Sequence, residues 1–272
     1  MSEHEKIGFI GAGNMATALI KGLLESGLYR GEHLLVSDKN EKAGRDVSGR
    51  FGVTCSLSNG QLVEGCSIVV LSVKPQNMRE VLEEVKEQIR ADQLLISIAA
   101  GIPLELIQRV IGKETPTIRA MPNTPALIQK GMTALAGNPL VRPEHMIVAK
   151  EIFDAVGEAV EVPESMMDAV TALSGSGPGY VFRMMECLVE AGVSVGLEKK
   201  VSHRLVIQTF LGAASLAKTS EEPLSKLREK VTSPGGTTAA GLEVFDQLGL
   251  EDIICKAVKA AHGRGVELGR KN

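Results

Sequence analysis

The feature that most constrains this chain is a glycine-rich loop near its amino terminus. The loop, Gly11-Ala12-Gly13-Asn14-Met15-Ala16, follows the apolar run Ile7–Ile10 and opens an amphipathic stretch typical of a helix. Its spacing is G-x-G-x-x-A, which binds a dinucleotide when it joins a strand to a helix at the start of a βαβ unit. Gly11 would permit the tight turn, Gly13 the approach of a pyrophosphate, and Ala16 close packing of helix on strand. We therefore expect a Rossmann domain here.

The predicted helix supplies further groups for binding an anion. The N–H groups of its first turn, including those of Asn14 and Met15, have no partner inside a helix, and the helix dipole places partial positive charge there. We expect the cofactor phosphates at this point.

The end of the second predicted strand bears on the choice between NAD and NADP. Asp38 stands about 20 residues beyond the loop, where an acid accepts a hydrogen bond from the adenine ribose 2′-hydroxyl of NAD. Ser37, Lys39, Lys42 and Arg45 surround it and could instead receive the 2′-phosphate of NADP. An aspartate beneath a phosphate is repulsive unless its side chain turns away. These residues alone leave the choice open.

Strand and helix patterns alternate up to about Val162, which indicates βαβ units and a parallel sheet. Strands are predicted over 7–10, 34–37, 68–73, 94–99, 117–120, 132–136 and 159–161, and helices over 14–26, 41–51, 78–89, 104–111 and 143–155.

After Pro163 the strand patterns stop and helical periodicity takes over, for example at Val181, Met184 and Leu188. The predicted fold is an α/β Rossmann dinucleotide-binding domain, residues 1–163, followed by an all-α helical domain for substrate binding and dimerisation, residues 164–272. A small helical domain with this much apolar surface often buries it against a second subunit, so we expect a homodimer or larger homo-oligomer.

Composition excludes several classes of function. The formal net charge is -3 with both signs interspersed, which argues against a nucleic-acid partner. The apolar runs are shorter than the roughly 20 residues of a membrane span, and the first residues are too few and too acidic for a secretory signal. Cysteines and histidines are scattered without metal-ligand spacing, so we expect no metal site and a cytoplasmic protein with reduced thiols.

A second cluster lies near the carboxyl terminus, where Ser233-Pro234-Gly235-Gly236-Thr237-Thr238 leads into a helical pattern over 239–248. A glycine-rich turn entering a helix is an anion site, and this one has hydroxyl groups beside it. No strand pattern precedes it, so one carboxylate suits it better than a second dinucleotide. The alternative is an ordinary Ser/Thr helix cap.

With this cluster the chain resembles the pyrroline-5-carboxylate reductase family, whose enzymes complete proline biosynthesis. The stretch Pro223–Asp246 is similar to that family's signature throughout. Further segments fit the family in order along nearly the whole chain: Val73-Lys74-Pro75, Ser97–Gly101, Arg119–Pro125 and Ser174–Pro178. The last of these we interpret as structural, a bend or a tight helix contact.

The resemblance implies a reaction and a set of site residues. L-1-pyrroline-5-carboxylate, a cyclic imino acid, would be reduced to L-proline by hydride from NAD(P)H, with NADP favoured and NAD the alternative. Thr238 would meet the substrate nitrogen as the catalytic residue, and Ser233, Gly236 and Thr237 would hold the carboxylate. Glu221 would support them from a nearby helix or be a solvated acid. Beyond the loop residues, the cofactor would be bound by Ser37, Asp38, Asn59, Lys74, Ala99, Met121 and Asn123.

Two other functions are weighed against this one. A β-hydroxyacid dehydrogenase shares the two-domain plan but needs a catalytic lysine from its helical domain, for which Lys199 and Lys200 are the candidates. A non-catalytic NADPH-sensing dimer would have no evident need for the carboxylate site at Ser233–Thr238. Asn59 also has a simpler interpretation, since a lone asparagine often just forms a turn.

Overall fold

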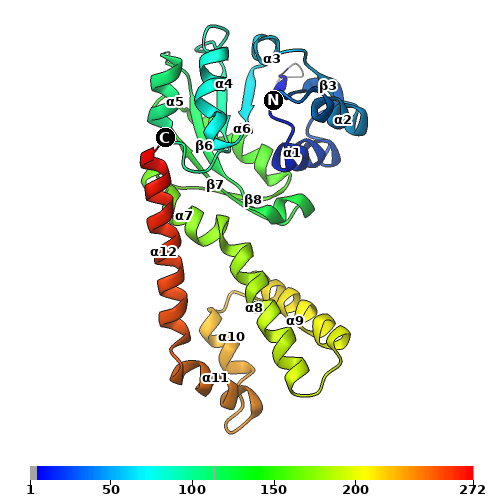
Figure 1. Ribbon diagram of the computed structural model, residues 1–272, viewed down its shortest axis with the longest axis vertical. Helices are drawn as coiled ribbons and strands as arrows, with labels where there is room; N and C mark the ends of the chain where they lie inside the picture. Colours follow the sequence, from blue (N-terminus) through cyan, green and yellow to red (C-terminus); the bar gives the residue numbers. More distant parts are fainter. Residues whose placement is uncertain (1–4, 113, 272) are drawn as a thin grey trace. The chain divides into compact units, whose positions relative to one another are not determined.

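The computed structural model describes residues 5–112 and 114–271, which form two compact units (Figure 1). The first unit comprises the chain up to Ser176 together with the chain from Ala261 onwards, and the second is Gly177–Ala260.

The described part of the first unit contains an eight-stranded sheet of order β3-β2-β1-β4-β5-β6-β7-β8. The strands are β1 (Ile7–Ile10), β2 (Leu34–Ser37), β3 (Thr54–Cys55), β4 (Ile68–Leu71), β5 (Leu94–Ser97), β6 (Thr117–Met121), β7 (Gly131–Gly137) and β8 (Gly157–Glu161). The strand order reverses between β1 and β4, and ligands bind outside the carboxyl ends of the strands at such a point.

The prediction of a parallel sheet is correct for β1 to β6 and wrong at β7. Strand β7 runs antiparallel to β6 and parallel to β8. The cause is the short connection between β6 and β7, which holds only the 3₁₀ turn η3 (Thr124–Ile128). A parallel pair needs a crossover of a dozen or more residues, so this connection can only reverse the chain.

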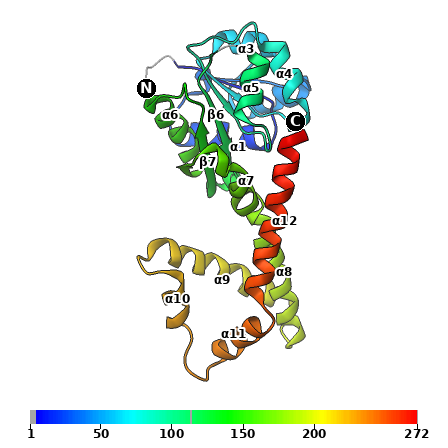
Figure 2. The ribbon, with the colours of Figure 1, turned by 90° about the vertical axis from the view of Figure 1, so that its left-hand side faces the viewer.

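Helices cover both faces of this sheet (Figure 2). Residues of α1 (Asn14–Glu25), α2 (Glu41–Phe51) and α6 (Pro143–Asp154) belong to one core, and residues of α3 (Asn59–Gly65), α4 (Met78–Val85) and α5 (Leu104–Ile111) to the other. Successive side chains of a strand point to opposite faces, so Phe9 lies in the first core and Ile10 in the second.

Helix boundaries agree with prediction where the sequence carries a stop signal. Helices α2 and α5 have the predicted bounds, and each is followed by a glycine with positive φ, Gly52 at 68° and Gly112 at 65°. Helix α4 ends at Val85, before the predicted end at residue 89. Helix α3 was not predicted, although Ser58 caps it by accepting the N–H of Gln61 at 3.2 Å.

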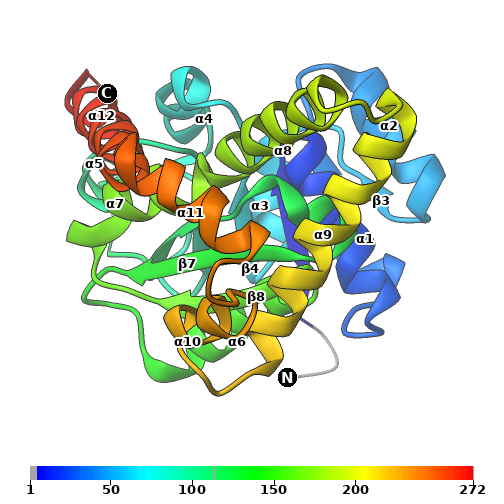
Figure 3. The ribbon, with the colours of Figure 1, turned by 90° about the horizontal axis from the view of Figure 1, so that it is seen from below.

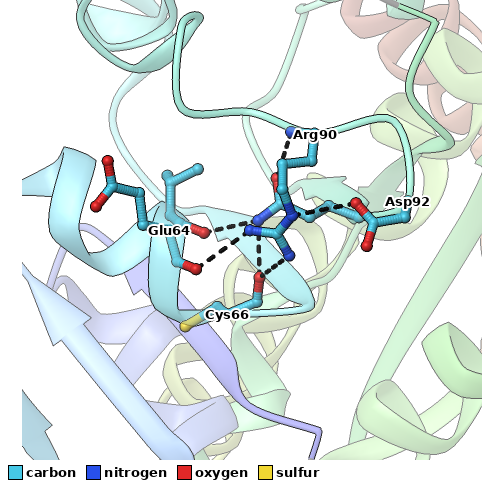
Figure 4. A network of polar contacts seen from close by, with 6 residues as sticks. Glu64, Cys66, Arg90 and Asp92 are labelled. Carbon is cyan, nitrogen blue, oxygen red and sulfur yellow. Dashed lines mark hydrogen bonds and ion pairs between the residues drawn. The ribbon is translucent and has the colours of Figure 1, made fainter.

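The carboxyl end of α3 is held by side chains from the segment before β5 (Figure 4). The Arg90 guanidinium donates to the Glu64 carbonyl at 3.2 Å and pairs with Asp92 at 3.1 Å. The buried Gln93 amide donates to the carbonyls of Val63 at 2.6 Å and Cys66 at 2.7 Å. These bonds satisfy carbonyls that a helix end leaves unpaired, and they fix the helix that begins at Asn59.

The second unit is helical, with α8 (Gly177–Ser194), α9 (Lys199–Thr219), α10 (Leu224–Lys230) and α11 (Thr237–Gln247) joined by loops (Figure 3). Helix α12 (Leu250–Lys271) starts in this unit, and its residues from Ala261 group with the first. Among residues 177–260 only Val189 and Ser202 are buried, where the Ser202 hydroxyl donates to the Val189 carbonyl at 2.8 Å. Large apolar side chains are exposed along these helices, among them Phe182, Leu205, Leu211, Phe245 and Ile253.

Candidate active site

The loop after β1 has the geometry that its glycines predicted. Gly11 has φ +104°, and a Cβ there would stand 2.7 Å from the Ser72 carbonyl oxygen, which is closer than Cβ atoms come to other heavy atoms in protein structures. Gly13 is the extended N-cap of α1, and apart from Gly13 itself and its chain neighbours no atom of the described chain lies within 4 Å of where its Cβ would be. Gly11 is therefore required by the fold, whereas the open space at Gly13 is available to a ligand. Ala16 is fully buried, as close helix packing requires.

Asp38 is turned onto the loop. Its Oδ2 accepts the N–H of Ala12 at 2.8 Å, and its Oδ1 accepts the N–H of Asn40 at 2.8 Å. Both carboxylate oxygens thus accept a backbone N–H, which stabilises the negative charge where it stands.

Ser37 and Asn59 form one hydrogen-bonded group with Glu84. The Ser37 hydroxyl donates to Asn59 Oδ1 at 2.7 Å, and Asn59 Nδ2 donates to Glu84 Oε2 at 2.8 Å. Asn59 is the first residue of α3, so the interpretation as a simple turn former is wrong: it stands at a helix N-terminus.

A cavity of about 640 Å³ lies over the carboxyl ends of β1, β2 and β4. Of the predicted cofactor residues, Gly11, Gly13, Asp38, Asn59 and Lys74 line it. Its size and position fit part of a dinucleotide, and Gly13, the N-cap residue of α1, is at its wall. Sequence reasoning missed Asn40, Asn77, Glu80 and Glu84, which also line it. The three- and four-residue spacing of 77, 80 and 84 after Lys74 is the signal that could have found the last three.

The other predicted cofactor residues do not line this cavity. Asn14 is exposed at the start of α1, Met15 packs against the core, and Ser37 is 2 % exposed behind Asn59. Ala99 is buried just beyond β5, and Met121 ends β6.

Asn123 braces the segment after β6. Its Nδ2 donates to the carbonyl and the hydroxyl of Ser174 at 3.2 and 3.3 Å, and its Oδ1 accepts the N–H of Met132 at 2.9 Å. Ser174 lies in a π-helical turn, Thr171–Gly175, that follows α7 (Met167–Val170). A Cβ on Gly175 would stand 2.6 Å from the Met121 methyl, so glycine allows the close contact. Such turns are frequent at functional sites.

The Ser233–Thr238 segment forms a turn and a helix start. Pro234 and Gly235 occupy its central positions, Gly235 has φ +69°, and the Gly236 N–H donates to the Ser233 carbonyl at 3.0 Å. The Gly236 N–H, which we predicted to hold the substrate carboxylate, is the donor of this turn hydrogen bond. The N–H groups of Thr237 and Thr238, at the start of α11, have no intrahelical partner, and no side chain caps them in the described chain.

Glu221 requires a correction as well. It lies in the loop between α9 and α10, not on a helix, and its side chain is exposed. The rival lysine site gains no support, since Lys199 is exposed at the start of α9 and pairs with Glu190 at 2.8 Å.

The described residues contain no group of three or more His, Cys, Asp or Glu placed to hold a metal ion. None of the described helices is long and apolar enough to cross a membrane.

Comparison with known proteins places these features in a family. Residues 164–268 match the family described as pyrroline-5-carboxylate reductase dimerisation, and residues 6–101 match the family described as NADP oxidoreductase, coenzyme F420-dependent. The pyrroline-5-carboxylate reductase of Methanosarcina acetivorans is 39% identical over 99% of this chain and 100% of its own length. That of Synechocystis sp. is 42% identical over 98% and 99%.

Solved structures agree with the sequence comparison. A pyrroline-5-carboxylate reductase from Coxiella burnetii is 37% identical with a TM-score of 0.94, covering 98% of this chain and 99% of that one. The Plasmodium falciparum pyrroline carboxylate reductase, solved with NADP bound, is 32% identical with a TM-score of 0.87 and the same coverage.

Together with the match to an NADP oxidoreductase family, the fold and the cavity define an NADP-dependent oxidoreductase with a Rossmann domain and a helical domain. The chain belongs to the pyrroline-5-carboxylate reductase family. The resemblance drawn from the motifs is therefore confirmed, and so are the predicted fold class and the NADP cofactor.

Proposed function

We propose that this protein reduces L-1-pyrroline-5-carboxylate to L-proline, the final step of proline biosynthesis. A hydride adds to the carbon of the C=N bond and a proton to its nitrogen, which leaves the saturated ring. The observation that carries the proposal is the 39–42% identity to reductases of this name over almost the entire chain, from the loop after β1 to the Ser233–Thr238 turn.

NADPH supplies the hydride when it is bound in the first unit. The start of α1, with Gly11, Gly13, Asn14 and Met15, would hold its pyrophosphate. Lys39 and Lys74 bring positive charge to the same cavity, and Asp38 keeps the loop in shape rather than meeting a phosphate. The remaining predicted cofactor residues keep these proposed places: Ser37 and Asn59 near the adenine ribose, and Ala99, Met121 and Asn123 near the nicotinamide.

The substrate carboxylate would bind the Ser233 hydroxyl and the N–H group of Thr237 at the start of α11. Thr238 would place its hydroxyl at the ring nitrogen. A threonine hydroxyl is a poor acid, so its role is to position and polarise the imine, and the proton comes from solvent or from an already protonated imine. Catalysis then depends mostly on orientation of the two reactants.

The test follows the absorbance of the reduced nicotinamide after purified protein is mixed with NADPH and pyrroline-5-carboxylate. Absence of turnover with both NADPH and NADH would overturn the proposal. Thr238→Ala should lower kcat by about 10-fold or more and leave the Kd of NADP⁺ unchanged. Thr232→Ala is the matched control, because the Thr232 hydroxyl already donates to the Arg228 carbonyl at 2.7 Å in the same segment. A wild-type rate in Thr238→Ala would remove Thr238 from the site.

The assembly is proposed to be a homodimer or a larger homo-oligomer formed through the helical domain. In residues 177–260 only Val189 and Ser202 are buried, so this unit has too little core of its own and needs a partner surface. Sedimentation at working concentration tests this, and a monomer would contradict it.

We keep 163/164 as the domain boundary, supported by the dimerisation match that begins at residue 164. A cytoplasmic location is proposed from four free cysteines: Cys55, Cys66, Cys187 and Cys255.

A further inference from the structure

The cavity at the β1–β4 switch point has an acidic wall that the family motifs do not account for. Helix α4 presents Glu80 and Glu84 to the cavity, one turn apart. Asp38 also lines it, but its two oxygens are engaged by backbone N–H groups. Within the described chain no lysine or arginine forms an ion pair with Glu84, whose partner is the neutral Asn59 amide. Glu84 is therefore an exposed negative charge beside the proposed adenine ribose position.

The Glu84 carboxylate also determines how Asn59 is oriented. A carboxylate only accepts hydrogen bonds, so the NH₂ group of Asn59 must face Glu84. The amide oxygen then faces Ser37, and the Ser37 hydroxyl is committed as a donor to it. Ser37 and Asn59 are the two neutral donors predicted near the ribose. The Ser37 hydroxyl is buried and already donates to Asn59, and the Asn59 NH₂ group already donates to Glu84.

This arrangement treats the two nicotinamide cofactors differently. The 2′-phosphate of NADP carries a charge of about −1.5 to −2 and would be repelled by Glu84. The 2′-hydroxyl of NAD is a donor that a carboxylate can accept. Lys39 and Lys74 line the same cavity and attract the phosphate, so they act in the opposite direction to Glu84.

We propose that Glu84 is a specificity-determining residue that weakens binding of the 2′-phosphate and so keeps NAD(H) usable by a protein of an NADP-binding family. The proposal rests on the proposed function in one respect, the placement of the adenine ribose in this cavity. It does not depend on turnover of pyrroline-5-carboxylate.

The experiment is isothermal titration calorimetry of NADP⁺ and NAD⁺ with the purified protein and no substrate. Glu84→Gln removes the charge and keeps an oxygen that can accept from Asn59. One charge acting on a phosphate at roughly 6 Å in a water-like medium, reduced by salt, changes the ratio of the two Kd values by about fivefold in favour of NADP⁺. Glu84→Lys should move it further, by about tenfold or more.

The matched control is Glu83→Gln on the same helix, because Glu83 pairs with Lys86 at 2.8 Å and does not line the cavity. It should change the ratio by less than about twofold, since its distance and its cation partner reduce its field. The Glu84→Gln effect should also shrink in concentrated salt. An unchanged ratio in both Glu84 variants, or an equal change in Glu83→Gln, would overturn the proposal. Loss of reductase activity with an altered Kd ratio would instead leave it standing.

Discussion

The two glycines of the loop after β1 should fail in different ways when each is replaced by alanine. Gly11 has φ +104° and no room for a Cβ, whereas Gly13 has ordinary extended backbone and open space around it. Gly11→Ala should therefore damage the fold, and Gly13→Ala should damage cofactor binding.

The magnitudes follow from the local geometry. In Gly11→Ala, a Cβ 2.7 Å from the Ser72 carbonyl oxygen adds overpacking to a strained backbone. Each of these costs about 1–3 kcal/mol, so we expect about 3 kcal/mol of lost stability and a Tm lower by roughly 6–12 °C. In Gly13→Ala, the free energy of unfolding should fall by only about 0.5–1 kcal/mol, because alanine is a poorer N-cap residue than glycine. Its methyl group would, however, occupy the space that a pyrophosphate must enter, and the Kd of NADP⁺ should rise at least about tenfold.

Thermal unfolding followed by circular dichroism and calorimetric titration of NADP⁺ measure the two effects separately. The reasoning is refuted if Gly13→Ala binds NADP⁺ like the wild type, since the open space would then not be the phosphate site. It is equally refuted if Gly13→Ala lowers the Tm as much as Gly11→Ala, because the proposed difference in packing would be absent.

Further predictions concern single side chains. Burial raises the pKa of the Cys66 thiol to about 12. The buried neutral thiol therefore contributes its full share of stability below pH 9, and this share is lost as the pH rises toward 12. Between pH 8 and pH 10 the Tm of the Cys66→Ala variant should fall by less than the Tm of the wild type. Asn123→Ala removes both bonds to Ser174 and the bond to Met132, so stability should fall by about 2–3 kcal/mol in urea unfolding, with kcat reduced more than NADP⁺ affinity. Asp38→Asn can accept only one of the two backbone N–H groups, those of Ala12 and Asn40, and should weaken NADP⁺ and NAD⁺ alike in titrations, leaving their Kd ratio within about twofold of wild type.

The sequence predicted helices best where local chemistry stops them. The bounds of α2 and α5 follow from glycines that adopt positive φ, a property of the residue itself. Helix α3 was not predicted because Asn59-Gly60 has the composition of a turn. In the structure, the burial of Leu62 and Val63 overrides that local preference. The reversal at β7 was missed because strand direction depends on the length of a connection, which periodicity within a strand does not report.

The candidate site, too, could be predicted from local sequence only in part. Motif spacing located Gly11 and Asp38 near the cofactor edge of the sheet, since each follows a strand, and the family resemblance added Asn59 and Asn123. It could not say which of them touch a ligand, because that depends on where neighbouring N–H and C=O groups point. Asp38 and Asn123 direct their polar atoms at the protein itself.

These inward-facing side chains explain how an aspartate and a phosphate-binding loop coexist. A negative charge that accepts two backbone N–H bonds is stabilised where it stands, and it holds the Ala12 peptide in the orientation that leaves the start of α1 open. Glu84 has one hydrogen bond, to Asn59, and retains most of its field. Two carboxylates on one cavity wall therefore have separable effects: neutralising Asp38 changes the shape of the loop, and neutralising Glu84 changes the preference for the ribose substituent. Residue type and position alone do not distinguish them; the hydrogen-bond partners do.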